Sequence, residues 1–508
     1  MNSLLMSLIL LTPLVIAASG WYRHSKWSLV VASAVPLISS LMLANGSVVT
    51  VEWLLLGSQF GLNDLTQWLL PATALVWLAA ALHNALASVG SIDKSTRLFF
   101  LLTMSGNLIL LLAQDALTFY VGYALMGLSG YGLVYRHRSS SARVAAKTYL
   151  RWTIAGELLL FSGLLAISHQ AGSTALPFTS STEFSTWSLL LVIAGFGIKI
   201  GMPGLHAWMP GAYSSSTTIG SAVFSGAMAN AGILGMLLFL PLQQPGYDTA
   251  GLLLLVMGLI GAAYGVLMGL PQRNPKVILA YSSMSQLSTL AALIGMALLK
   301  PQLAPALVIA IVIYALHHGL TKAALFLALD GLSNIRFKHL SVLMLGVLSL
   351  IMAGLPFTSG DIAKTLSKQA IPKDYEWLLA LLTLGSILTA LLMSRFVYIC
   401  ATSERKQKAI SLGAALGMSL LLLVIAHMAM YLFVALPDIG LKNLLPLGVA
   451  LVLISLFLVL PETMRSQLLP VTPKGDILNL LTKVLLRKLA RISNSTLVKR
   501  LNQATKMR

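Results

Sequence analysis

Hydrophobic residues along this chain lie in runs of about 18 to 25, the length that a helix needs to cross about 30 Å of hydrocarbon. Short segments with glycine, proline and polar residues separate the runs. The pattern predicts an all-α polytopic membrane protein with about 15 transmembrane helices. The predicted spans lie near residues 2–20, 27–45, 66–90, 97–113, 115–135, 145–169, 186–206, 215–241, 247–268, 276–298, 303–328, 340–360, 376–398, 410–435 and 443–460.

Two of the predicted spans are interrupted next to a lysine. The segments GIKIGMPGLHAWMPG at 197–211 and AGLPFTSGDIAK at 353–364 both place glycine and proline inside or beside a span. Broken helices at corresponding positions of two halves are typical of inverted repeats around a transport site. We therefore predict two inverted five-helix repeats with broken helices, at 97–241 and 247–398.

The predicted repeats are flanked by three further regions of the chain. Residues 1–96 hold spans 1–3, residues 410–460 hold the C-terminal spans, and residues 461–508 form a basic tail. In this tail, apolar residues at helical spacing alternate with lysines and arginines over 476–505. This pattern favours an amphipathic helix on the anionic inner leaflet of the lipid bilayer, and a helix docked on a partner protein is the alternative.

Composition and charge agree with a membrane protein. Only 10% of the residues are charged and 57% are hydrophobic, whereas a soluble chain carries about a quarter charged residues. Of the basic residues, 17 lie in loops on one side and ten in the tail, against four on the other side. Because basic loops stay in the cytoplasm, the N-terminus is expected outside and the C-terminus in the cytoplasm. The net charge of +19 thus lies beside the membrane, and no nucleic-acid partner is expected.

Cysteine usage limits the chemistry that this chain can perform alone. Cys400 is the only cysteine, so neither a disulfide framework nor a cysteine-based metal or iron–sulfur site can form within the chain. We expect no cofactor and no metal here, and any redox centre must belong to a partner. No nucleophile–base pair emerges from the sequence, so no reaction is expected of this chain by itself.

Three lysines lie at membrane depth: Lys199, Lys322 and Lys364. A charged group at that depth costs at least about 2.5 to 3.5 kcal/mol, so lysines kept there need a reason. Burial disfavours the charged form of a lysine and a nearby carboxylate favours it, which allows a proton to be taken up and released. One interpretation is a chain of proton-relay stations. The other is lysines that snorkel to an interface or neutralise a helix C-terminus.

Three histidines are candidates for the same relay. His318 lies four residues before Lys322 on a predicted helix and shares a face with it, and His317 is its neighbour. An imidazole there could pass protons near neutral pH, or could be a hydrogen-bonded core residue. His206, between the two prolines of PGLHAWMP, either caps the broken helix or carries protons.

The carboxylates divide into one near mid-membrane and two near span ends. Glu157 lies about ten residues into the sixth span, about 15 Å at helical rise, and Lys199 on the next span is its natural partner. Asp115 and Asp361 are as suited to capping helices as to conducting protons. The serines and the amide of YSSMSQ at 281–286 could hold a chain of water molecules or serve packing.

Five strings in this order resemble a known family, the antiporter-like proton-conducting membrane subunits of respiratory complex I, Mrp cation/proton antiporters and membrane-bound hydrogenases. They are AQDALTFYVGYALMGLSGYGLV, IKIGMPGLHAWMPGAYSSSTTIGSAVFSGAMANAGILG, NPKVILAYSSMSQLS, HHGLTKAALFL and AGLPFTSGDIAK. The resemblance implies a fourteen-helix core of two inverted repeats, with a broken helix in each. It also implies a water-linked proton path through Lys199, Lys322 and Lys364.

Two positions depart from the family pattern. The family usually has a glutamate after an aromatic residue in the fifth span, and here Tyr123 is followed by Ala124. Many members also have a lysine in the eighth span, where this chain has Asn230. Either Glu157 or Asp115 has taken over the role of the acid, or the subunit has lost pumping.

We therefore expect a proton-translocating subunit, with or without cation exchange, in a larger respiratory, hydrogenase or Mrp-type complex of a bacterial cell (inner) membrane. Its partners would be other membrane subunits, the lipid bilayer, and protons or small cations; the complex could be an NADH:quinone oxidoreductase-like or hydrogenase enzyme. One alternative is the membrane subunit of an energy-coupled inorganic-carbon uptake system with a soluble zinc-binding partner. The other alternative is a structural subunit that does not pump.

Overall fold

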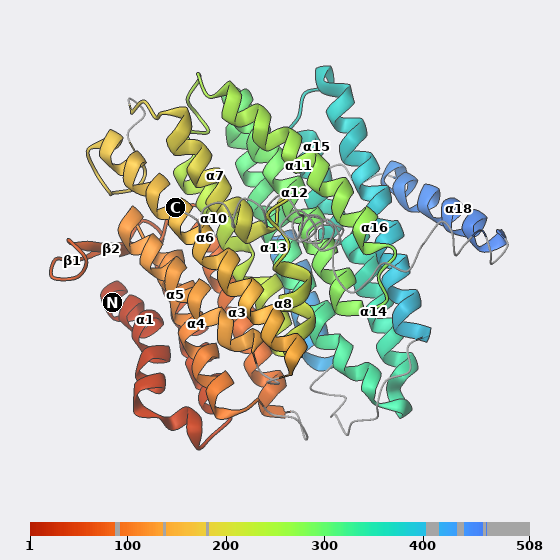
Figure 1. Cartoon of the computed structure of the whole chain (residues 1–508), viewed down its shortest axis with the longest axis horizontal. Coiled ribbons are helices and arrows are strands. Elements are labelled where there is room, and N and C mark those ends of the chain that lie inside the picture. The colour runs from red at the N-terminus through yellow and green to blue at the C-terminus, as the bar shows by residue number, and fades with distance from the viewer. Residues whose placement is uncertain are drawn as a thin grey trace, which may run out of the picture.

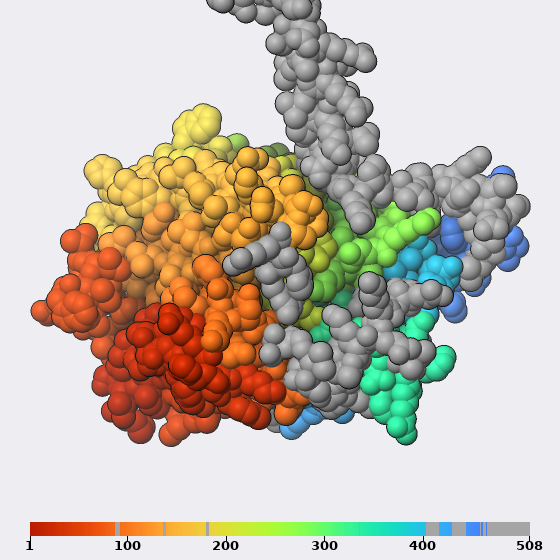
Figure 2. Space-filling view, turned by 60° about the horizontal axis from the view of Figure 1, so that its bottom comes forward, coloured from red at the N-terminus to blue at the C-terminus, as the bar shows by residue number. Residues whose placement is uncertain are grey.

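The computed structural model describes residues 1–86, 92–135, 139–178, 182–402, 416–433, 441–460 and 464. It is a bundle of helices that runs from the N-terminal elements at one end of the molecule to α16 and α18 at the other (Figure 1). The space-filling view shows the same order, from the red N-terminal helices to the blue C-terminal ones (Figure 2). The predicted amphipathic helix at 476–505 lies outside the described residues.

The helices before the second half are α1 Asn2–Ser19, α2 Ser28–Met42, α3 Thr66–Leu86, α4 Lys94–Leu112, α5 Ala116–Val134, α6 Ser140–Ala171, α7 Thr186–Ile200, α8 Met209–Ser215, α9 Thr218–Val223 and α10 Asn230–Phe239. Those that follow are α11 Asp248–Gly269, α12 Pro275–Leu299, α13 Ala304–Ala328, α14 Lys338–Ala353, α15 Ser359–Gln369, α16 Glu376–Thr402, α17 Met418–Phe433 and α18 Leu445–Val459. Two antiparallel strands, β1 Val48–Val51 and β2 Ser58–Gly61, form a hairpin between α2 and α3.

Within the described residues, ten helices are long and apolar enough to cross a membrane, and five shorter apolar helices accompany them. This confirms a multi-pass, all-α membrane protein. The number of spans, fifteen, and the two inverted repeats stay predictions. The hairpin was not predicted, because its alternation of residues is too short to stand out beside the long apolar runs.

Both predicted interruptions are present. α7 ends at Ile200 and α8 begins at Met209, with Gly201 at φ 73° as the C-cap of α7. α14 ends at Ala353 and α15 begins at Ser359, with Gly354 at φ 95° as the cap. Positive φ is readily adopted by glycine, which explains why each helix ends where it does.

The helices that carry the first-half site approach each other closely. α6 packs against α7, and a Cβ added at Gly156 or Gly195 would lie about 3 Å from atoms of the other helix. Small residues allow such approach between membrane helices. The eighth predicted span is also irregular, because a π-helical turn, η2 Phe224–Met228, separates α9 from α10. Such turns are frequent at functional sites.

Candidate functional site

Glu157 on α6 and Lys199 on α7 line one pocket inside the first half. Both side chains are buried, with 6% and 7% of their surface exposed. The pocket is completed by α5 residues and by Trp208 in the break after α7, and its lining is Tyr123, Gly127, Tyr149, Thr153, Gly156, Glu157, Gly195, Ile198, Lys199 and Trp208. The two residues therefore lie at the same pocket, and their partnership stays a prediction.

The carboxylate and the ammonium share the pocket without forming an ion pair. Among the described residues, no Glu157–Lys199 pair lies within 4.0 Å, and Glu157 Oε1 makes no hydrogen bond. The Lys199 ammonium instead lies over the aromatic ring of Tyr123, 5.4 Å from the ring centroid. A pair that is close but not in contact can change its separation, and therefore its interaction energy, with a small movement of either side chain.

Gly127 on α5 provides the space that the Glu157 carboxylate occupies. A Cβ at this position would lie 2.3 Å from Glu157 Oε1. Gly127 lies one helical turn after Tyr123, so the face of α5 toward the pocket presents an aromatic ring and a gap. Ala124 is partly exposed and carries no polar group.

The segment between α7 and α8 is fixed by a hydrogen bond to α7 and by ring contacts to the second half. Trp208 Nε1 donates to the carbonyl oxygen of Ile198 at 2.8 Å, which satisfies an acceptor in the last turn of α7. The ring of buried His206 packs against Tyr264 of α11, with 5.1 Å between centroids, and lies near Tyr281 of α12. His206 therefore lies where the first broken helix meets the second half.

Lys322 lies in the interior of the second half with no exposed surface. Its ammonium donates to the carbonyl oxygen of Leu279 on α12 at 3.1 Å. The same carbonyl accepts from Ser283 Oγ, which is 2.8 Å from Ser225 Oγ in the π-helical turn. Ser283, from the predicted YSSMSQ segment, thus connects Lys322 to the irregular eighth span.

His317 and His318 are both fully buried on α13, one turn before Lys322. His317 Nδ1 lies 3.0 Å from Ser359 Oγ at the start of α15, so this histidine faces the second break. Neither ring nitrogen of His318 has a hydrogen-bond partner among the described residues. Asn230, which stands where many family members have a lysine, donates from its side chain to the carbonyl of Ala315 on the same helix as the histidines.

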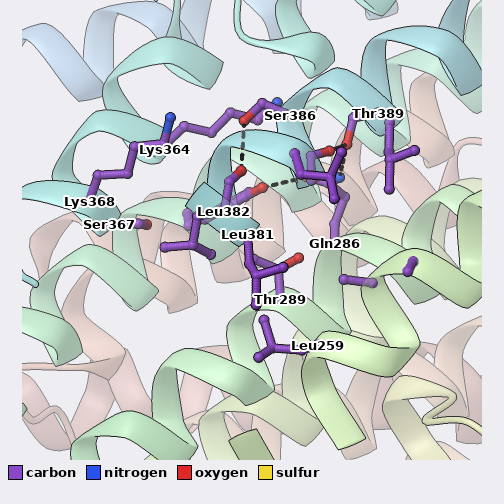
Figure 3. Close-up of a pocket in the computed structure, with 16 residues that line it drawn as sticks. Leu259, Gln286, Thr289, Lys364, Ser367, Lys368, Leu381, Leu382, Ser386 and Thr389 are labelled. Carbon is purple, nitrogen blue, oxygen red and sulfur yellow. Dashed lines mark hydrogen bonds between the residues drawn. The ribbon is translucent and has the colours of Figure 1, made fainter. Parts of the chain in front are cut away.

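Lys364 on α15 reaches back across the second break. Its ammonium donates to the carbonyl oxygen of Ala353, the last residue of α14, at 2.6 Å. Lys364 also borders a pocket of about 70 Å³ between α11, α12, α13, α15 and α16. Figure 3 shows Lys364 and Lys368 on one side of this pocket and Gln286 with Thr389 on the other. Gln286 Nε2 donates a hydrogen bond to Thr389 Oγ1 at 2.9 Å.

The two remaining predicted carboxylates make the hydrogen bonds of structural residues. Asp115 caps α5, because its side chain accepts from the amide of Thr118 at 2.7 Å and from that of Gln59 at 2.9 Å. Asp361 accepts from the amide of Phe357 at 3.3 Å and from the side chain of Asn443 at 2.8 Å. These contacts fit the capping interpretation, and a relay role for Asp115 stays a prediction.

The structure adds polar residues that sequence reasoning did not select. His83 on α3 pairs with Asp330 after α13, with 3.0 Å between Nε2 and Oδ2, and Thr218 donates to the other carboxylate oxygen at 2.6 Å. His427 on α17 lies at the second break, 3.4 Å from the amide nitrogen of Ser359. An ionisable residue within an apolar run is the signal that could have drawn attention to His83 and His427.

The fold is that of a multi-pass membrane protein in which buried lysines lie beside two interrupted helices. The family described as "NADH:quinone oxidoreductase/Mrp antiporter, TM" matches residues 113–389 of the chain. This is more than half of the 508 residues, and the chain belongs to this family. The resemblance drawn from the five sequence strings is thereby confirmed.

Relatives with assigned names come from several kinds of membrane complex. Hydrogenase-4 component B of Escherichia coli (strain K12) is 32% identical over 259 residues, which cover 47% of this chain and 38% of that protein. The chain thus spans well under half of this relative's length. NADH-quinone oxidoreductase subunit M of Rhodobacter capsulatus is 26% identical over 419 residues, which cover 72% of this chain and 78% of that one.

Solved structures show the same fold over nearly the whole chain. A chain of the Mrp complex from Dietzia sp. DQ12-45-1b superposes with a TM-score of 0.75 at 20% identity and covers 99% of this chain and 61% of its own. A chain of an archaeal respiratory membrane complex, the membrane-bound sulfane sulfur reductase, gives 0.73 at 23% identity, covering 99% and 95%.

Proposed function

We propose that this chain is a proton-translocating subunit of a larger membrane complex in which Lys199, Lys322 and Lys364 hold the proton in turn. The observation that carries the proposal is that all three ammonium groups are buried and none forms an ion pair within 4.0 Å among the described residues. Instead, the ammonium of Lys199 lies over an aromatic ring, and those of Lys322 and Lys364 each donate to a backbone carbonyl. Such partners tolerate loss of the proton better than a fixed salt bridge does.

In the first half, Glu157 acts as the partner that controls Lys199. When the carboxylate approaches the ammonium, the protonated lysine is stabilised; when it withdraws, the proton is released toward the second half. We assign the role of receiving it to His206, which lies in the break after α7, where this segment contacts the second half. The break lets α7 and α8 move relative to each other without disrupting a continuous helix.

In the second half, the proton passes from Lys322 to Lys364 through the buried histidines. His318 lies one turn from Lys322 on α13, and His317 contacts Ser359 at the start of α15, which carries Lys364. We further propose fifteen spans, ten of them in two inverted five-helix repeats, with the N-terminus outside, and other membrane subunits as partners, as in the complexes of the relatives. The inorganic-carbon alternative stays a prediction.

Proton flux through the whole complex tests this function. The complex, purified with its own partner subunits, is placed in liposomes that contain a pH-sensitive dye, and a potassium diffusion potential drives protons inward. Lys199→Met should lower the flux about tenfold, the effect of about 1.4 kcal/mol on the barrier. The exposed Lys94 at the start of α4 provides the control Lys94→Met, which should leave it unchanged. A Lys199→Met complex that assembles normally and conducts like the native one would overturn the proposal.

A further inference from the structure

His427 of α17 reaches the second break from outside the part of the chain that the family model matches. Its Nδ1 lies 3.0 Å from the carbonyl oxygen of Leu423, one turn earlier on the same helix. A carbonyl can only accept, so Nδ1 carries the hydrogen. Nε2 then has a free lone pair, and it accepts the backbone N–H of Ser359 at 3.4 Å. The imidazole is therefore neutral in this arrangement.

The bond to Ser359 provides the start of α15 with an acceptor from another helix. The N-cap of α15, Thr358, makes no side-chain capping bond to the helix. The first amides of a helix have no partner within it, so an acceptor from elsewhere stabilises the helix start. The hydroxyl of the same Ser359 lies 3.0 Å from His317 Nδ1. Two histidines, from α13 and α17, thus meet at the first residue of the half-helix that carries Lys364.

We propose that His427 is a positioning residue whose protonation releases the start of α15. A protonated imidazole has no lone pair, so the bond from the Ser359 amide is lost when Nε2 takes a proton. The new positive charge also faces the positive end of the α15 dipole, which is unfavourable. Both effects loosen the first turn of α15. Because Lys364 lies on α15 and bonds Ala353 across the break, its position becomes linked to the protonation of His427. This inference rests on the proposed function only where Lys364 is taken as a relay station.

Several charged groups share this region and act on His427 together. α13, α15 and α3 pack against α17. The titratable groups that they bring are Tyr314, His317, His318 and Lys322 on α13, Asp361, Lys364 and Lys368 on α15, and His83 on α3, which is paired with Asp330. The negative Asp361 and the positive lysines act in opposite directions on a charge at His427.

Amide hydrogen exchange tests the contact without using transport activity. Exchange of the segment 354–366 is measured by mass spectrometry in the whole complex at a series of pH values. After correction for the intrinsic rate, native protection should fall severalfold toward the acidic end. In His427→Gln the side-chain oxygen still accepts from Ser359 but does not titrate, so protection should not depend on pH. The exposed His339, at the far end of α14, supplies the control His339→Gln, which should behave like the native protein.

The flux assay supplies the second readout. The pH profile of proton flux should flatten on its acidic side in His427→Gln and keep its native shape in His339→Gln. If His427→Gln shows the native pH dependence of both protection and flux, the inference about His427 is wrong. The proposed function still holds in that case, provided that Lys199→Met loses flux. If Lys199→Met conducts normally, the proposed function fails, and the exchange data alone decide whether His427 holds α15.

Discussion

The ammonium of Lys199 lies over the ring of Tyr123, 5.4 Å from the ring centroid. Tyr123 occupies the fifth-span position whose neighbour is usually a glutamate in the family that this chain resembles, and that neighbour is Ala124 here. A cation over a desolvated aromatic ring gains about 2 kcal/mol. The ring therefore replaces part of the stabilisation that an acid on α5 would give to the charged lysine.

Tyr123→Leu is expected to lower proton flux several-fold, because the charged form of Lys199 loses the ring while the site stays apolar. Tyr123→Phe keeps an aromatic face and should retain most of the flux. The two variants are compared in the liposome assay at equal amounts of assembled complex. Equal loss in both would mean that the hydroxyl of Tyr123 matters and the ring does not.

Gly127→Ala should impair transport more than stability. The added Cβ would lie 2.3 Å from Glu157 Oε1, so the carboxylate must move away. A flexible side chain can move at small cost in stability, but its distance to Lys199 changes. We expect a several-fold loss of flux with a melting temperature within a few degrees of the native complex. The matched control is Gly346→Ala on α14, where nothing lies within 4 Å of the added Cβ; an unchanged flux in Gly127→Ala would show that the carboxylate position is not critical.

The proposed orientation can be tested with reporter fusions after residues 140, 175, 275 and 405. The distribution of basic residues places 140, 275 and 405 in the cytoplasm and 175 outside. A reporter that is active only in the cytoplasm should therefore fail at 175 and work at the other three positions. Cytoplasmic activity at 175 would contradict the topology.

The sequence predicted the breaks well, because glycine and proline act locally. Gly201 and Gly354, with φ of 73° and 95°, end their helices where the sequence indicates. The depth of a residue along a helix could also be predicted, and Glu157 and Lys199, which were expected to be partners, line one pocket. The distance between the carboxylate and the ammonium could not be predicted, since Gly127 from a third helix provides the space that the carboxylate occupies.

Contacts between distant segments could not be predicted from one sequence. His83 and Asp330 are separated by 247 positions and meet only because α3 packs against α13. His427 lies within an apolar run, which marks it as unusual, but nothing near it in the sequence points to Ser359. The hydrophobic pattern sets which residues are buried in helices and leaves open which helices become neighbours.

The strongest test of the site concerns the missing acid of the fifth span. Ala124 has no charge to offer Lys199, and Glu157 is the carboxylate that lines the same pocket. Glu157→Gln keeps the shape and removes the charge, so it should lower proton flux about as much as Lys199→Met, by about tenfold.

If the two residues act as a unit, the double variant Glu157→Gln with Lys199→Met should conduct little less than either single variant. The reason is physical: once the lysine cannot hold a proton, the charge that controls it has nothing to act on. Asp115→Asn is the comparison, because Asp115 makes the bonds of a helix cap and its loss should reduce assembly rather than flux per complex. Losses that multiply in the double variant would show that Glu157 and Lys199 act independently, and a native flux in Glu157→Gln beside an inactive Lys199→Met would place the working acid on a neighbouring subunit or at Asp115.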